Sequence, residues 1–340
     1  MAILVRLIRS VALALAMALM LPALAGAQWI NPTAEAVQEA QLLKQTQRIA
    51  GECSIADQKA CTVEQLWGRD WTYFNEWVLR LVGGGAILAL IALVTAIYLV
   101  HGKGRIEHGR SGRVMLVFSA FERFVHWLTA TCFFILALTG LNITFGKLLL
   151  LPLIGPAAFS TISRWGTYAN NYFSFPFTIG VLLMIPIWIH WNIPNRVDIQ
   201  WMLEGGGFVG KKHPPADRFN AGQKSIYWVV VLGGLIAAGT GYPMIFPYDG
   251  TVIFGMQLTQ LVHGLVGLLY VAAMVFHVYM ATIGEEGAFE SIWDGTADEN
   301  WVKQNHSVWY EREIAGGSLP KAAPDSKQQP PRDPTLEPAE

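Results

Sequence analysis

Five long apolar stretches divide the chain, and each is long enough to cross a bilayer, which takes about 20 apolar residues. The stretches carry few or no charged side chains, and polar loops separate them. This pattern predicts an all-α integral membrane protein with five transmembrane helices. The predicted spans are residues 81–100, 124–145, 172–193, 225–246 and 258–283.

The last span contains two histidines, His263 and His277, fourteen positions apart. Fourteen residues of helix rise about 21 Å and complete almost four turns, so both side chains leave the same face near opposite sides of the membrane. Ionisable residues inside a span are costly and indicate function, and neutral imidazole is an axial ligand of haem iron. The pair predicts a cytochrome with stacked b haems. Two core histidines hydrogen-bonded to facing helices are the alternative.

Composition supports a membrane protein and excludes two other classes. Hydrophobic residues make up 53% of the 340 residues and charged residues 14%, which is untypical of a soluble domain. The formal net charge of −1 argues against a polyanionic partner. Three cysteines are too few for an iron–sulfur cysteine array.

The N-terminus has the features of a signal peptide. Arg6 and Arg9 precede a short apolar run over residues 11–21, and small residues follow at 25–27. These features predict a signal peptide over residues 1–27, with an uncleaved anchor as the alternative.

Residues 28–76 form the predicted periplasmic segment, with an amphipathic helix over residues 35–49. Cys53 and Cys61 lie in this segment, in an oxidising compartment, and either form a disulfide or remain free.

Basic residues give the orientation independently of the signal peptide. The second loop between spans has only Lys147 and Arg164, and the fourth has no Lys or Arg. Positive loops stay in the cytoplasm, so the pattern predicts a periplasmic N-terminal segment and a cytoplasmic C-terminus. The basic residues of the first and third loops are Lys103, Arg105, Arg110, Arg113, Arg123, Arg196, Lys211, Lys212, Arg218 and Lys224.

This topology places His126, at the start of the second span, in the same leaflet as His277. The two are predicted to hold one haem between two helices. Arg123, one turn before His126, is placed to meet a haem propionate, or is an ordinary positive-inside arginine. His190 is expected at the interface. The remaining histidines are expected to be solvated: His101, His108, His213 and His306.

His263 lies on the periplasmic side and needs a partner from the outer end of another span. Met244 is one conceivable thioether ligand, although a methionine in a span is far more often a core residue. The outer span ends contain no histidine. They offer Asn142, Asn170, Asn171, Tyr172, Tyr242, Met244 and Tyr248.

Several motifs in this order resemble the gamma subunit of membrane-bound formate dehydrogenase, in its longer form with a signal peptide. They are AFERFVHWLTATCFFILALTGLN (120–142), HWNIP (190–194), RFNAGQK (218–224), and the last span followed by EEGAFE. The resemblance runs from about residue 105 to 309. It implies a quinone-reducing cytochrome b in which four of the five helices form the haem-binding bundle.

The resemblance implies two b haems held by histidines of three helices. His126 and His277 match the cytoplasmic-side pair, and His263 matches one ligand of the periplasmic-side haem. The family has a second histidine at the outer start of the third span, where this chain has Asn170. The outer haem is therefore absent, five-coordinate, or held by another group, and the haem count is one or two.

The resemblance also implies a quinone site on the cytoplasmic side, formed by Asn220 and Gly222. Amide or backbone N–H donors suit a quinone carbonyl. From residue type alone, Asn220 and Gly222 fit a helix N-cap and turn equally well.

The sequence therefore predicts a signal peptide, a periplasmic segment, a membrane cytochrome b domain over residues 77–283, and a cytoplasmic tail over 284–340. Residues 285–309 are expected to lie along the membrane or a partner, with disorder from about residue 315. The predicted protein, in the bacterial inner membrane, passes electrons from an iron–sulfur beta subunit to quinone, while a catalytic alpha subunit oxidises formate. A cytochrome b of another dehydrogenase, such as a hydrogenase, and an anchor with impaired electron transfer are the alternatives.

Overall fold

The computed structural model describes residues 68–207, 213–247, 253–318 and 320–322 of the chain. Five helices in this part are long and apolar enough to cross a membrane, which confirms the five predicted spans. The predicted signal peptide and the two cysteines Cys53 and Cys61 lie outside the described residues. The spans run over Asp70–His101, Ala120–Leu149, Leu151–Trp191, Ala221–Ile245 and Gly255–Gly284.

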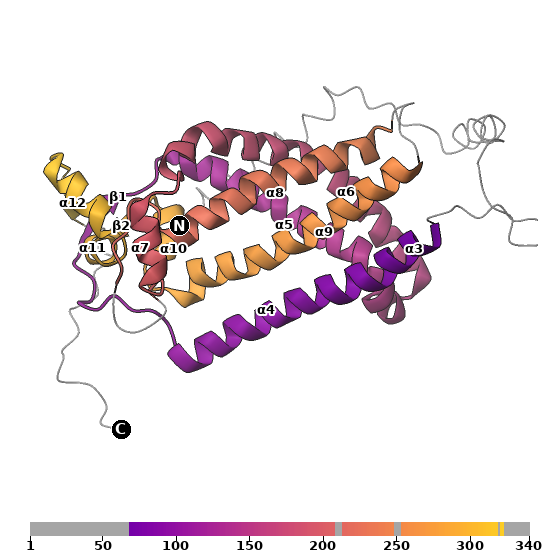
Figure 1. Cartoon of the computed structure of the whole chain (residues 1–340), viewed down its shortest axis with the longest axis horizontal. Helices are drawn as coiled ribbons and strands as arrows, with labels where there is room; N and C mark the ends of the chain where they lie inside the picture. Colours follow the sequence, from indigo (N-terminus) through magenta and orange to yellow (C-terminus); the bar gives the residue numbers. More distant parts are fainter. Residues whose placement is uncertain (1–67, 208–212, 248–252, 319, 323–340) are drawn as a thin grey trace, which may run out of the picture.

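Four helices form the bundle, and the first span lies along its edge beside α9 (Figure 1). The bundle helices are α5 (Ala120–Leu149), α6 (Leu151–Trp188), α8 (Ala221–Ile245) and α9 (Ile253–Tyr279). The first span comprises α3 (Gly68–Tyr73), the π-helical turn Phe74–Leu79 and α4 (Arg80–His101). Its helix therefore begins well before residue 77, where the sequence predicted the membrane domain to start.

Two bundle helices, α5 and α8, start with capping boxes. Ser119 accepts a hydrogen bond from the backbone of Glu122 at the start of α5. Asn220 accepts one from the backbone of Gln223 at the start of α8. Both caps satisfy backbone N–H groups that a helix start leaves unpaired, so the sequence sets where these spans begin.

The middle of the bundle is an aromatic layer of three residues from three helices. Tyr270 of α9 packs against Phe133 of α5, with ring centroids 4.7 Å apart, and against Phe177 of α6, at 6.1 Å. The backbones of α5 and α6 approach closely beside it, because a Cβ at Gly180 would clash with Thr129. This aromatic layer fixes the faces that α5, α6 and α9 turn toward one another.

The first span packs less tightly. Of the 18 most apolar consecutive residues of this span, only 6% are buried within the protein. Leu81, Leu88 and Leu99 are exposed. It meets α9 where a Cβ at Gly83 would clash with Leu268. Its exposed apolar face suits contact with lipid.

One end of the bundle carries a folded layer made from the first loop and the tail, which we call the cap (residues 102–119, 285–318 and 320–322). A three-stranded antiparallel sheet with the order β2-β1-β3 holds the cap together. Its strands are β1 (Arg113–Leu116), β2 (Thr296–Asp298) and β3 (Lys321–Ala322). Its helices are α10 (Ala288–Trp293), α11 (Glu299–Asn305) and α12 (Ser307–Ala315).

The tail therefore folds onto the first loop, and the expectation that residues 285–309 lie along the membrane or a partner was wrong. Trp301 and Trp309 are each 4% exposed within the apolar core of the cap. Arg110 of the first loop donates to both carboxylate oxygens of Glu290 in α10, at 2.9 and 2.6 Å. Loop and tail are thus joined by a shared core and a bidentate ion pair.

His306 is a second correction, since the sequence predicted a solvated side chain. It is 3% exposed and its Nδ1 lies 2.8 Å from the carbonyl oxygen of Asp217. Its ring lies 5.1 Å from that of Trp301. Burial lowers the pKa of His306 to about 4, so the neutral imidazole donates to the Asp217 carbonyl at neutral pH.

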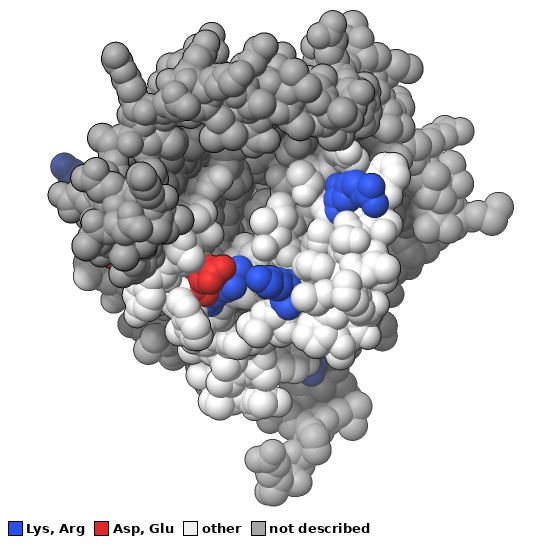
Figure 2. Space-filling model, turned by 90° about the vertical axis from the view of Figure 1, so that its right-hand side faces the viewer, with Lys and Arg blue, Asp and Glu red and all other residues white. Residues whose placement is uncertain are grey.

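The far end of the bundle has a different surface. Viewed from that end, the described residues are mostly uncharged, with few basic and acidic side chains (Figure 2). The ion pairs Arg110–Glu290, Arg218–Glu122 and Lys224–Asp198 lie at or beside the cap instead. Among the described residues, the charged side chains of the loops that the sequence marks as positive thus gather at the capped end.

Glu285 predicts a pH dependence of cap stability. Its Oε1 accepts a hydrogen bond from Trp301 Nε1 at 2.8 Å, and burial raises its pKa to about 7. The folded cap therefore holds a proton that the unfolded chain releases near pH 4.5, and this stability is lost as the pH rises from about 4.5 to about 7. The loss is at most about 3 kcal/mol. The variant Glu285→Gln should remove this dependence.

The measurement is urea-dependent proteolysis of the cap at pH 5 and pH 8. The wild type should be less resistant at pH 8, and Glu285→Gln should be equally resistant at both. The exposed Glu311 offers the control Glu311→Gln, which should behave as the wild type. An unchanged pH response in Glu285→Gln would contradict the assignment.

Candidate haem and quinone sites

His126 and His277 face each other at the capped end of the bundle. His126 precedes Phe133 by seven residues on α5, and His277 follows Tyr270 by seven residues on α9. Because α5 and α9 run in opposite directions, both histidines lie two turns, about 10 Å, from the aromatic layer on the same side. Their ring centroids are 6.4 Å apart with an interplanar angle of 53°.

This separation fits a metal ion held between the rings. Metal–nitrogen bonds to histidine measure about 2 Å, so two rings on opposite sides of one iron have centroids about 6 Å apart. The buried Nδ1 of His126 has no hydrogen-bond partner among the described residues. A core histidine that served packing alone would be expected to satisfy its ring nitrogens. The pair therefore fits axial ligands of a haem better than a structural contact.

Aromatic residues of the cap cover this histidine pair. Trp127 stands edge-on to His126, at 5.4 Å, and donates from Nε1 to the carbonyl of Ile292 at 3.2 Å. Its ring also packs against Phe289 and Trp293 of α10. The cap thereby keeps water from the capped-end side of His126.

Arg123 and His190, the other predicted neighbours, have different surroundings. Arg123 donates from Nη1 to the carbonyl of Trp293 at 2.7 Å, which ties α5 to the cap. Its Nε is buried without a partner among the described residues. His190 is exposed, and its ring lies 4.9 Å from that of Trp191 at an interplanar angle of 49°.

His263 lies near the far end and is oriented by α8. Its Nδ1 lies 3.0 Å from the carbonyl oxygen of Ala237 and 3.1 Å from Thr240 Oγ1. A carbonyl only accepts, so Nδ1 carries the proton and Nε2 keeps a lone pair. Metal-ligating histidines have this arrangement, in which the second ring nitrogen donates to a carbonyl.

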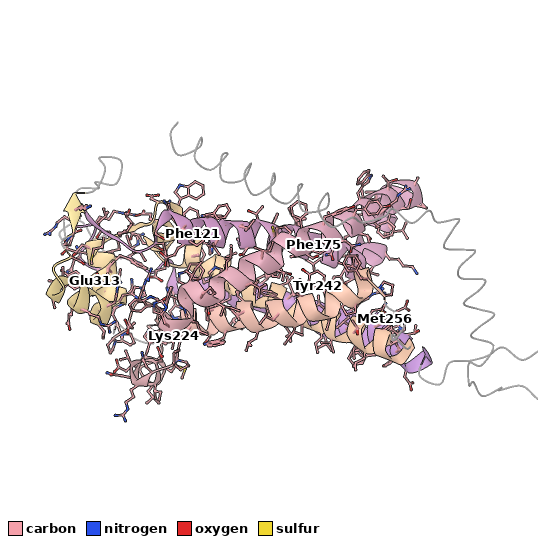
Figure 3. The ribbon with its side chains drawn as sticks, turned by 90° about the horizontal axis from the view of Figure 1, so that it is seen from above. Phe121, Phe175, Lys224, Tyr242, Met256 and Glu313 are labelled. Carbon is pink, nitrogen blue, oxygen red and sulfur yellow. The ribbon has the colours of Figure 1, made fainter. Side chains whose placement is uncertain are left out.

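Two polar groups predicted near the far end, Asn170 and Tyr242, have partners of their own. Asn170 donates from Nδ2 to Thr139 Oγ1 at 3.0 Å and to the carbonyl of Leu136 at 3.3 Å, both on α5. Tyr242 donates to Thr178 Oγ1 at 2.8 Å. Its ring lies 5.4 Å from that of Phe175, and both are labelled in Figure 3. The described part of the far end supplies no second histidine for His263.

Asn220 is the N-cap of α8, so the alternative that the sequence left open describes its structural role. Its Oδ1 accepts from the backbone of Gln223, and its backbone N–H donates to Gln223 Oε1, both at 2.9 Å. Neither bond uses the Nδ2 donors. A Cβ at Gly222 would lie 3.3 Å from Asn220 Oδ1 and from the ring of Trp201. Glycine therefore keeps this turn narrow and its backbone close to Trp201.

Two ion pairs hold this turn in place, and the sequence did not reveal them. Lys224 Nζ lies 2.8 Å from Asp198 Oδ2 of α7 (Arg196–Leu203), with side-chain exposures of 5% and 9%. Arg218 Nη2 donates to Glu122 Oε1 at 2.8 Å and to the carbonyl of Val117 at 2.7 Å. The sequence indicates only the positive-inside pattern for Arg218 and Lys224. Their acidic partners could not be predicted, because they lie far away along the chain.

The comparison with protein families gives the chain its class. Residues 117–295 match the model of the family described as prokaryotic cytochrome b561. The chain belongs to this family. It is a multi-pass membrane cytochrome b, and the family implies haem b as its cofactor, in agreement with the facing histidines.

Similar proteins have formate dehydrogenase in their names. The nitrate-inducible formate dehydrogenase cytochrome b556(Fdn) subunit of Escherichia coli (strain K12) is 30% identical over 199 residues, which cover 57% of this chain and 88% of that protein. The formate dehydrogenase cytochrome b556 subunit of Haemophilus influenzae is 27% identical, covering 56% and 80%. The cytochrome b556(fdo) subunit of Escherichia coli (strain K12) is 25% identical, covering 60% and 95%.

The buried pair Lys224–Asp198 leads to a stability prediction. The variant Lys224→Met leaves the Asp198 carboxylate buried without its charge partner, which should cost about 3–5 kcal/mol. Thermal unfolding of the purified protein in detergent should show a clearly lowered midpoint. The double variant Lys224→Met/Asp198→Asn should recover part of the loss, because the amide oxygen still accepts from Asn195.

The exposed Lys103 offers the matched control, and Lys103→Met should leave the unfolding midpoint unchanged. If Lys224→Met proves as stable as Lys103→Met, the pair does not hold α7 against α8.

Proposed function

We propose that this chain is the membrane cytochrome b subunit of a formate dehydrogenase, which carries electrons from an iron–sulfur beta subunit through b haem to quinone. The facing histidines at 6.4 Å carry this proposal, because they give the bundle a site for an electron carrier. The names of the similar proteins supply the dehydrogenase. Formate itself would be oxidised by a separate catalytic alpha subunit.

The inner haem would be held by His126 and His277. The haem supplies reversible one-electron chemistry when bound. The protein orients both rings by the packing of α5 against α9 through Phe133 and Tyr270. Trp127, covered by α10, excludes water from this site.

Quinone would bind beside the start of α8, where Asn220 and Gly222 lie. The capping bonds fix the Asn220 side chain and leave its Nδ2 to donate to a quinone carbonyl. Gly222 lets the backbone of this turn lie close to Trp201, because a Cβ there would already be 3.3 Å from the Trp201 ring and from Asn220 Oδ1. The site lies at the capped end, and quinone reduction would take up protons from that side.

The capped end would face the cytoplasm of a bacterium, with the protein in the inner membrane. The basic residues Arg110, Arg218 and Lys224 at this end support that orientation, because positive segments remain inside. The signal peptide over residues 1–27 and the periplasmic segment that follows would then place the iron–sulfur partner at the far end. Copurification with a formate-oxidising subunit, rather than with a hydrogenase, tests the choice of complex.

The first prediction from this function concerns the inner haem. The variants His126→Ala and His277→Ala should each lower the haem b content by up to one per chain, because each removes one of the two ligands of the inner haem. The haem content of the purified subunit, measured as the pyridine haemochrome, gives the result. His190→Ala is the matched control and should keep the wild-type content. Full haem in both ligand variants would exclude the assigned ligands.

The second prediction separates capping from quinone binding at Asn220. Asn220→Asp keeps an oxygen that caps α8 but removes the Nδ2 donor, so the KM for quinone should rise roughly tenfold. Asn220→Ala should in addition lower the unfolding midpoint, since an N-cap contributes about 1 kcal/mol. Assays of quinone reduction by the intact complex, with thermal unfolding alongside, provide both values. Wild-type KM in Asn220→Asp would leave Asn220 a cap alone.

A further inference from the structure

We propose that the far half of the bundle holds a second b haem with His263 as its single protein ligand. Its other axial position would be open to a small neutral ligand such as carbon monoxide. This inference rests on the proposed haem-binding function, and it concerns a different histidine and a different half of the bundle. Four observations carry it.

The first observation is the depth of His263 and Asn170. His263 precedes Tyr270 by seven residues on α9, and Asn170 precedes Phe177 by seven residues on α6. The rings of Tyr270 and Phe177 are in contact, at 6.1 Å. Since α6 and α9 run in the same direction, His263 and Asn170 lie at one depth, two turns beyond the aromatic layer, on the faces that these helices turn to each other.

The second observation is unfilled space at that depth. Gly140 follows Phe133 by seven residues on α5, and Gly267 lies one turn after His263 on α9. Apart from the glycine's own helix backbone and chain neighbours, no heavy atom of the described residues would lie within 4 Å of a Cβ at either position. Both glycines lie on the helix faces that carry the ligand histidines, so the space belongs to the interior face and suits a flat, bulky cofactor.

The third observation is the tautomer of the His263 ring. Its Nδ1 is bonded to Ala237 and Thr240, which both belong to α8. Since Nδ1 carries the proton that the Ala237 carbonyl accepts, Nε2 keeps the lone pair that an iron would take.

The fourth observation is what α6 offers at the depth of His263. Asn170 uses its amide nitrogen for α5, through Thr139 and Leu136. A carboxamide has no imidazole-like nitrogen lone pair, and its hard oxygen is a poor match for ferrous haem. At this depth α6 thus supplies a neutral residue that would not ligate the iron. At the capped end, His126 closes the corresponding position on His277.

The test is a haem count together with a carbon monoxide difference spectrum of the dithionite-reduced chain, purified in detergent. The wild type should contain two haems per polypeptide, of which one reacts with carbon monoxide. His263→Ala should lose the reactive haem and keep the other. Asn170→His should keep both haems and abolish the reaction with carbon monoxide, because the new imidazole closes the open position.

Asn171→His is the matched control, since residue 171 lies about 100° around the helix from residue 170. It should leave the carbon monoxide reaction intact, which separates ligation from a general effect of an added histidine. One unreactive haem in the wild type would overturn this inference and leave the proposed inner haem standing. Two haems without any reaction would also overturn it. A wild-type chain with no haem at all would overturn the proposed function as well.

Discussion

The contact of Phe133, Phe177 and Tyr270 is the constraint on which the rest of the bundle depends. Once these rings meet, the helical repeat fixes what lies two turns away on each helix. On one side of the layer it brings His126 to His277, and on the other it places Asn170 at the same depth as His263. The separation of the proposed ligand positions is thus set by packing at the centre of the bundle.

Polar groups at and beside the cap need hydrogen-bond partners, which lipid does not offer. These groups include the helix starts, the buried ions and the edge of the small sheet. Arg218 and Lys224 find theirs in Glu122 and Asp198. These bonds attach α8 to α5 and α7, so the Asn220 turn is held from several sides. These ion pairs beside the cap therefore position the proposed quinone site.

The sequence predicted the features that depend on long runs or on topology. Five spans follow from apolar length, and the pairing of His126 with His277 follows from loop charges, since opposite helix directions place both in one leaflet. The cap could not be predicted, because strands of two to four residues show too little alternation. The prediction of a solvated His306 was wrong because its burial depends on the folded cap. Its partner Asp217 is distant in sequence, and its contact with Trp301 follows no recognisable pattern.

In the proposed arrangement, a single asparagine would give the two halves of the bundle different chemistry. Axial ligands set the reduction potential of a haem, so two imidazoles at the capped end and one at the far end would give two distinct potentials. The bundle supplies the same aromatic layer to both positions, and His263 and His277 are fourteen residues apart on one helix. The difference between the two proposed sites would therefore arise from position 170 rather than from the fold. One side chain on α6 would thus set both the driving force for electron transfer across the membrane and the accessibility of the outer iron.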